Sequence, residues 1–177
     1  MSEHVRQVVE QHMRRVDDFP EPGVEFIDLT PVFANADAFP VIVDGLAAGH
    51  DYQDIDVVAG LDARGFLLSA AVALRAGTGV LAIRKAGKLP PPVHSIEYHL
   101  EYGSAKLEVP AEGLARAGKK VLVVDDVLAT GGTLEAAIAL LDKCGAEVVG
   151  LSVVLEVTGL GGRDRLTDTP LTVLATS

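Results

Sequence analysis

The stretch Val123–Thr133 (VVDDVLATGGT) determines the fold and indicates the chemistry. It ends a short buried strand that is predicted from Lys120 to Val124, continues through two adjacent acids, and opens a helix predicted from Leu134 to Lys143. A strand that passes through a glycine-rich turn into a helix is typical of βαβ units and of a mainly parallel sheet. Ligands of such sheets bind beyond the carboxyl ends of the strands, where this turn lies.

The rest of the 177-residue chain repeats this pattern. Apolar runs predict further strands at 56–60, 79–83 and 147–155, with an edge strand at 171–175. Helical spacing predicts helices at 5–13, 37–48 and 66–75. The fold class is therefore α/β, with a mainly parallel central sheet flanked by helices, and the length favours one domain that spans residues 1–177.

Two segments depart from the pattern. The N-terminal segment, 1–35, is predicted to be a helix followed by a proline-shaped loop, DFPEPGVEFIDLTPVF. Residues 84–109 begin with a cationic, proline-rich stretch (RKAGKLPPP) that is predicted to be irregular. They then alternate polar and apolar residues around Tyr102-Gly103-Ser104, which predicts a β-hairpin. An insertion of this length indicates a lid or a binding loop.

Composition excludes several partners. The formal net charge of −10 disfavours nucleic acid and anionic membranes, although a local positive pocket can still bind one small anion.

The single cysteine, Cys144, follows an apolar helical run and is interpreted as a packed small residue rather than a reactive thiol. The first 16 residues contain no continuous apolar region, which argues against a signal peptide or membrane span and leaves a cytoplasmic location as the expectation.

The glycine-rich turn indicates a phosphate site. Gly131 and Gly132 allow main-chain amides to approach a phosphate, and the following helix adds unpaired N–H groups. Asp125 and Asp126 would repel that phosphate unless they face hydroxyl groups or Mg²⁺, and a phosphorylated ribose offers both. The alternative is an ordinary strand–helix turn with solvated acids. The chain contains no GxxxxGK[ST] motif, so this is not a P-loop.

The turn resembles the phosphoribosyl pyrophosphate (PRPP) motif of the type I phosphoribosyltransferases. The segments DFPEPGVEFIDLTPVF, GLDARGF, IRKAGKLP and LEYGSAKLEV resemble the adenine-specific branch, in the same order, from about Phe19 to Leu166. The resemblance implies the type I phosphoribosyltransferase fold with a small N-terminal base-binding hood and a flexible loop and hairpin lid at 84–109. It also implies transfer of the phosphoribosyl group to adenine with release of pyrophosphate, Mg²⁺ bound with PRPP, and a homodimer.

The same resemblance assigns site residues. The residues implied for the phosphate and ribose of PRPP or AMP are Asp125, Asp126, Ala129, Thr130, Gly131, Gly132 and Thr133, with Asp125 also a candidate Mg²⁺ ligand. Those implied for pyrophosphate are Arg64, beside the turn at Asp62-Ala63, together with Arg84, Lys85 and Lys88. Those implied for adenine are Val24, Glu25, Phe26, Ile27 and Val127. The catalytic residues implied are Glu101, Asp126 and Arg64, with Tyr102 helping to close the lid.

Each assignment has a simpler alternative. Arg64 could be a surface cation that caps a turn, the 84–88 cations a solvated run, Phe26 a core residue and Glu101 a hairpin surface carboxylate. The chain also departs from the family that it resembles at Glu25, where an apolar residue is usual, and at Ile27, where many members carry arginine. The three consecutive prolines at 90–92 are unusual as well.

Two other functions remain open from the sequence. A phosphoribosyltransferase for another base would share the PRPP motif and differ only in the base pocket. A regulator that binds PRPP without catalysis would normally add a DNA-binding module and a basic surface, and the sequence indicates neither.

Overall fold

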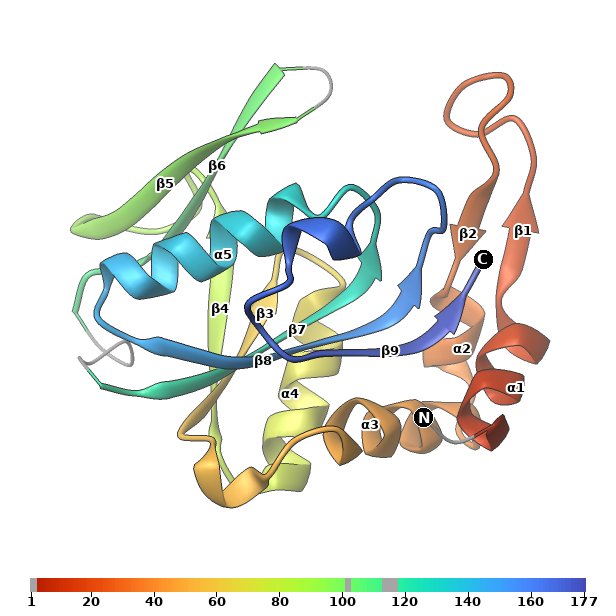
Figure 1. The fold of residues 1–177 in the computed structure, drawn as a ribbon, viewed down its shortest axis with the longest axis horizontal. Helices are drawn as coiled ribbons and strands as arrows, with labels where there is room; N and C mark the ends of the chain where they lie inside the picture. The colour runs from red at the N-terminus through yellow and green to blue at the C-terminus, as the bar shows by residue number, and fades with distance from the viewer. Residues whose placement is uncertain (1–2, 101–102, 113–117) are drawn as a thin grey trace.

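A computed structural model describes residues 3–100, 103–112 and 118–177 (Figure 1). Its helices are α1 (Glu3–His12), α2 (Thr30–Ala34), α3 (Ala38–Ala48), α4 (Gly65–Ala76) and α5 (Gly132–Lys143), with short 3-10 helices η1 (Tyr52–Asp54) and η2 (Arg163–Arg165). Its strands are β1 (Arg14–Val16), β2 (Phe26–Asp28), β3 (Val57–Leu61), β4 (Gly79–Lys85), β5 (Val93–Leu100), β6 (Gly103–Pro110), β7 (Lys120–Leu128), β8 (Glu147–Glu156) and β9 (Leu171–Thr176).

The central sheet has the strand order β5-β6-β4-β3-β7-β8-β9. The five strands from β4 to β9 are parallel, whereas β6 and β5 continue the sheet in the antiparallel sense. The sheet is therefore mainly parallel, and β9 forms the predicted edge. The carboxyl ends of β3 and β7, which are neighbours, lead into the LDARG and ATGGT loops.

Alternate side chains of the strands supply two cores on opposite faces of the sheet. Val58, Leu122 and Val124 pack with α3 and α4 on one face. Val57, Val121 and Val123 pack with α5 on the other, and Figure 1 shows α5 across the sheet from α4. This covering of both faces explains why the central strands are continuous apolar runs.

Three local predictions need correction. First, β7 extends to Leu128, so Asp125 and Asp126 lie within the strand; its continued pairing with β8, for example Leu128 with Glu156, carries it past the apolar run. Second, the segment predicted as a proline-shaped loop contains α2 and strand β2, which pairs antiparallel with β1. These two strands are too short to show the alternation of polar and apolar residues from which strands are predicted. Third, Arg84 and Lys85 belong to β4 because they pair with β6.

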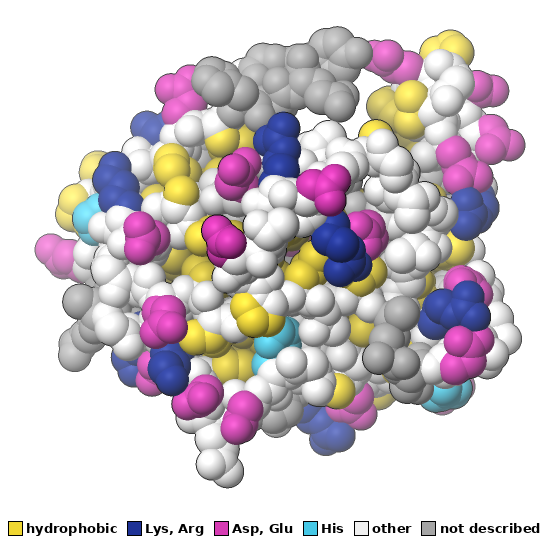
Figure 2. Space-filling view, in the orientation of Figure 1, with side chains coloured by type: hydrophobic (Ala, Val, Ile, Leu, Met, Phe, Trp, Pro, Cys, Tyr) yellow, Lys and Arg dark blue, Asp and Glu magenta, His cyan; other side chains and the backbone are white. Residues whose placement is uncertain are grey.

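Two surface properties bear on partners. No helix in the described ranges is long and apolar enough to cross a membrane. On the face seen in Figure 2, acidic side chains are scattered over the surface and basic side chains lie in small groups among them. The charge on this face is thus mixed rather than gathered by sign.

Candidate active site

The ATGGT segment, residues 129–133, forms a compact loop that we call the phosphate loop. Gly131 has a positive φ of 82° and is the N-cap residue of α5, which starts at Gly132. A cavity of about 80 Å³ is lined by Asp125 and the residues from Val127 to Leu134. The predicted phosphate residues therefore surround one hollow at a helix N-terminus, where unpaired amides and the helix dipole favour an anion.

Of the two adjacent acids, Asp125 lines this hollow, and Asp126 has different surroundings. Asp125 is approached by the start of α4, where a Cβ on Gly65 would lie 2.9 Å from Asp125 Oδ1. Loss of water from the carboxyl group, followed by the charge of Asp126, raises the pKa of Asp125 well above its usual value. Asp126 is buried instead against Arg64.

Arg64 joins three segments that are distant in the sequence. Its Nε lies 2.7 Å from Asp126 Oδ2, and its guanidinium carbon lies 5.9 Å from the centroid of the Phe26 ring. The base-binding segment, the LDARG loop and β7 therefore meet at one point. This placement disfavours the alternative of Arg64 as a simple surface cap, although its side chain keeps 37% of its exposure.

The predicted pyrophosphate cations gather around Asp62. Lys88 Nζ lies 3.1 Å from Asp62 Oδ2, and Arg84 Nε lies 3.6 Å from the same oxygen. The Asp62 side chain is only 5% exposed. Burial alone would raise the pKa of Asp62, but hydrogen bonds from Lys88 and the Lys85 amide, with the charges of Lys88 and Arg84, lower it. Lys85 itself is exposed.

Two buried side-chain atoms in this region have no hydrogen-bond partner among the described residues. They are Asp126 Oδ2, which has a close ionic contact to Arg64 but no aligned donor, and Arg84 Nε. Buried polar atoms without partners are uncommon in folded proteins and call for a specific explanation. Here one acceptor and one donor both belong to the predicted PRPP site.

The predicted adenine residues separate into two groups. Phe26 is half-buried and makes an edge contact with Phe19, their ring centroids being 5.2 Å apart, and Val127 is half-buried beside the phosphate loop. Val24 is exposed. By contrast, the Ile27 side chain packs in the core and Glu25 pairs with Arg15. Any contact from positions 25 and 27 to a base would therefore come from the main chain.

Two residues assigned from the sequence, Glu101 and Tyr102, lie outside the described part of the chain. One contact at the site was not predicted. Asp62 was treated only as part of a turn, yet its carboxylate engages two of the predicted cations. The signal available in the sequence was a single acid at the end of an apolar strand, which does not identify its partners.

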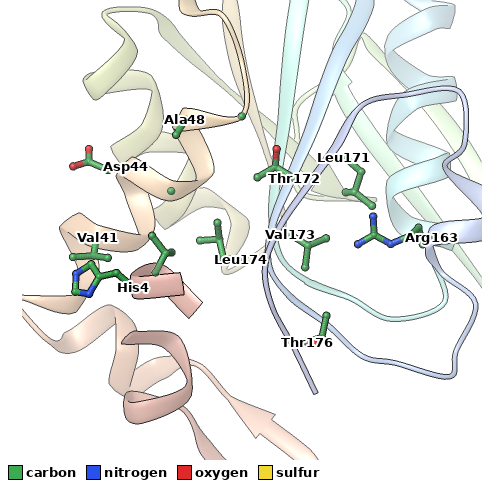
Figure 3. Close-up of a pocket in the computed structure, with 13 residues that line it drawn as sticks. His4, Val41, Asp44, Ala48, Arg163, Leu171, Thr172, Val173, Leu174 and Thr176 are labelled. Carbon is green, nitrogen blue, oxygen red and sulfur yellow. The ribbon is translucent and has the colours of Figure 1, made fainter. Parts of the chain in front are cut away.

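A second cavity lies away from this region. It has a volume of about 690 Å³ and lies between α1, α3 and β9 (Figure 3). Its lining includes Val5, Gly45 and Leu174, and none of the predicted site residues is among the described residues that line it. The smaller hollow at the strand ends, rather than this larger groove, is lined by Asp125 and by the residues predicted to bind phosphate.

Comparison with known proteins agrees with this geometry. Residues 34–172 match the phosphoribosyl transferase domain family. An adenine phosphoribosyltransferase of Corynebacterium diphtheriae is 63% identical over 169 residues, which cover 96% of this chain and 92% of that protein. One of Rhodococcus jostii is 57% identical over 171 residues, covering 97% of this chain and 96% of that protein.

Solved structures are similar over the whole chain. An adenine phosphoribosyltransferase of Rhodothermus marinus is 37% identical with a TM-score of 0.92, covering 99% of this chain and 100% of that one. The Saccharomyces cerevisiae enzyme, complexed with an iminoaltritol bisphosphate and adenine, is 33% identical with a TM-score of 0.91, covering 98% and 99%. The chain therefore belongs to the phosphoribosyltransferase family and, within it, to the adenine phosphoribosyltransferases.

Proposed function

We propose that the protein transfers the 5-phosphoribosyl group from PRPP to adenine, giving AMP and pyrophosphate, and that it serves purine salvage. The observation that carries this proposal is the pair of buried atoms that make no hydrogen bond within the described residues, Asp126 Oδ2 and Arg84 Nε. A ribose hydroxyl would donate to the first, and a pyrophosphate oxygen would accept from the second. The phosphate loop lies between β7 and α5, where a 5′-phosphate would complete the set.

The reaction replaces the bond from the anomeric carbon to pyrophosphate with a bond from the same carbon to N9 of adenine. A transition state with oxocarbenium character is expected, as in other glycosyl transfers. The protein would contribute chiefly by positioning both reactants and by neutralising the departing pyrophosphate with Arg64, Arg84 and Lys88. Closure of residues 84–109 over the site would exclude water, which would otherwise capture the reactive sugar. Adenine loses its imidazole proton when N9 forms this bond, and Glu101 is proposed as the acid/base residue that accepts the proton or as a charge-stabilising residue near the purine.

Magnesium would enter the site with PRPP. In the described residues no group of three or more His, Cys, Asp or Glu is arranged to hold a metal ion. Asp125 and Asp126 nevertheless suit Mg²⁺, which binds one or two carboxylates while substrate oxygens and water fill its other positions. When bound, Mg²⁺ would neutralise the pyrophosphate, while Asp126 would hold Arg64 and the ribose hydroxyls.

Adenine would lie between Phe26 and Val127. Main-chain groups of residues 24–27 would recognise the N6 donor and N1 acceptor of adenine, since the side chains of Glu25 and Ile27 are engaged elsewhere. A 6-oxopurine would leave those main-chain groups unpaired, which is costly in a closed site. Residues 1–35 are therefore proposed as a base-binding hood on a single domain that spans 1–177.

We also propose a homodimer that uses the outer face of α4 and β4. Leu67, Leu74 and Val80 are exposed there by 58%, 84% and 43%. Exposed apolar side chains that cluster on two neighbouring elements favour a protein contact. Both elements also lead to the proposed site, because α4 follows Arg64 and β4 contains Arg84. Sedimentation velocity should show a dimer that Leu74→Glu dissociates, whereas Leu160→Glu, at an exposed leucine elsewhere, should leave it intact.

A cytoplasmic location stays a prediction from the sequence.

The activity is tested with purified protein, Mg²⁺, PRPP and a panel of bases. We expect AMP and pyrophosphate with adenine, and no nucleotide with hypoxanthine, guanine or xanthine. Product with another base and none with adenine would change the assigned substrate. Calorimetric binding of PRPP without turnover of any base would instead support the non-catalytic regulator.

A further inference from the structure

Residues 159–166, after β8, had no role in the sequence analysis, although they contain the glycine-rich run Gly159-Leu160-Gly161-Gly162. They lie against the back of the phosphate loop. A Cβ on Gly131 would lie 2.7 Å from the Gly162 carbonyl oxygen. Reciprocally, a Cβ on Gly162 would lie 2.8 Å from Leu128 Cδ1 and would overlap the Ala129 carbonyl oxygen. The two backbones thus touch at a place where neither tolerates a side chain.

The residue after Gly162, Arg163, forms an ion pair with Glu156. Arg163 Nη2 lies 2.6 Å from Glu156 Oε2, and Arg163 Nε lies 3.2 Å from both carboxylate oxygens. The Glu156 side chain is only 13% exposed. A two-pronged arginine–carboxylate contact fixes orientation as well as distance. The Arg163 side chain itself stays about half exposed, at 53%, and it lines the cavity beside β9 that Figure 3 shows.

Glu156 is in turn attached to the strand that leads into the phosphate loop. It pairs in register with Leu128, the last residue of β7, and the Val157 amide donates to the Leu128 carbonyl at 2.8 Å. The chain of contacts therefore runs from β7 to Glu156, to Arg163, to Gly162 and back to Gly131. A second contact from the same segment, Arg165 to Glu135 of α5, is longer at 3.4 Å and joins two exposed side chains.

We propose that Gly162 and Arg163 form the rear wall of the phosphate loop and are positioning residues for the 5′-phosphate. The proposal rests on the proposed function. Because main-chain amides cannot adjust as a flexible side chain can, a small displacement of this wall misdirects several donors at once. The effect should fall on the monophosphate end of the ligand and spare the pyrophosphate end.

The test compares the binding of AMP and of magnesium pyrophosphate by calorimetry. Arg163→Ala and Glu156→Gln should each weaken AMP binding by about ten-fold or more while pyrophosphate binding stays within about two-fold. Arg163→Lys should restore affinity only in part, because lysine lacks the planar fork. Gly162→Ala should weaken AMP binding further. Arg165→Ala is the matched control in the same segment and should bind both ligands as the unaltered protein does.

Unchanged AMP affinity in Arg163→Ala and Gly162→Ala would overturn this proposal alone. An equal loss for AMP and pyrophosphate would also overturn it, because that result indicates general destabilisation. If Arg163→Ala does not fold, Glu156→Gln and Arg163→Lys supply the same comparison. If the unaltered protein bound neither AMP nor PRPP, both this proposal and the proposed function would fall.

Discussion

The phosphate loop and the cationic segment, residues 84–88, are two parts of the same proposed site that are built in opposite ways. The phosphate loop contains no charged side chain and offers main-chain amides shaped by glycine and close packing. The cationic segment offers Arg84, Lys85 and Lys88, two of which are paired with Asp62. The shape of the phosphate loop is set by its backbone. In the cationic segment, by contrast, a ligand must compete with the Asp62 carboxylate for the positive charges.

Because of this difference, substitutions in the two segments should affect ligand binding in different ways. Changes to the phosphate loop should act through shape and be insensitive to salt. Changes near Asp62 should act through charge and weaken as ionic strength rises, because the cations are partly exposed.

The largest effect is expected for Gly131→Ala. This change places a methyl group against the Gly162 carbonyl and forces a positive φ on alanine, so AMP affinity should fall by about a hundred-fold or more. Gly118→Ala is the matched control, since its φ of 81° is equally strained but its Cβ would meet none of the described residues within 4 Å. Calorimetry at two salt concentrations measures both. An equal loss in the two variants would show that strain alone, and not the wall contact, is responsible.

Arg64→Ala should have the next largest effect. It removes a cation proposed to hold pyrophosphate and leaves the buried Asp126 without its ionic partner, so kcat/KM for PRPP should fall by about a hundred-fold. Arg75→Ala, on the same helix and paired with the exposed Asp44, should keep near-normal kinetics. Normal kinetics in Arg64→Ala would remove Arg64 from the site.

Asp62→Asn should have a smaller effect in the opposite direction. Without this carboxylate, Lys88 and Arg84 are free to face the ligand, and affinity for magnesium pyrophosphate should rise about three- to ten-fold at low salt. The gain should shrink at high salt. Asp54→Asn, which breaks an exposed pair with Lys120, should change nothing. Weaker binding in Asp62→Asn would show that the acid orders the cations more than it competes for them.

The smallest effect concerns stability and pH. Folding raises the pKa of Asp125. At pH values above the usual aspartate pKa, the folded state therefore binds more protons than the unfolded chain. The free energy of unfolding consequently falls as the pH rises through this interval. Asp125→Asn should therefore raise Tm at pH 7 by about 2–4 °C for each kcal/mol relieved, and the gain should shrink as the pH is lowered toward that range. Thermal unfolding at several pH values measures this. A lower Tm at pH 7 would contradict it.

The elements that the sequence predicted best are those bounded by local signals. Helices α3 and α4 end at Gly49 and Gly77, and the observed ends lie within one residue of the predictions. Strand ends were less predictable, because pairing with a neighbour decides them, as in the extension of β7 along β8. The phosphate loop was visible as a motif, whereas Asp62 and Gly162 act through partners that only the folded chain brings near.

The pairing of β3 with β7, in which Gly60 lies opposite Val124, has a consequence for substrate size. Adjacent strands in any sheet lie about 4.8 Å apart, and β7 continues four residues beyond this pair, to Leu128, whereas β3 ends at Leu61. The LDARG loop therefore leaves the sheet earlier than the ATGGT loop, and the backbone of the two strands sets the offset between the two proposed anion sites that the sugar would bridge. Residues 24–27 and 84–92 can vary, and with them the base or the rate of closure, while this offset would still suit the same ribose.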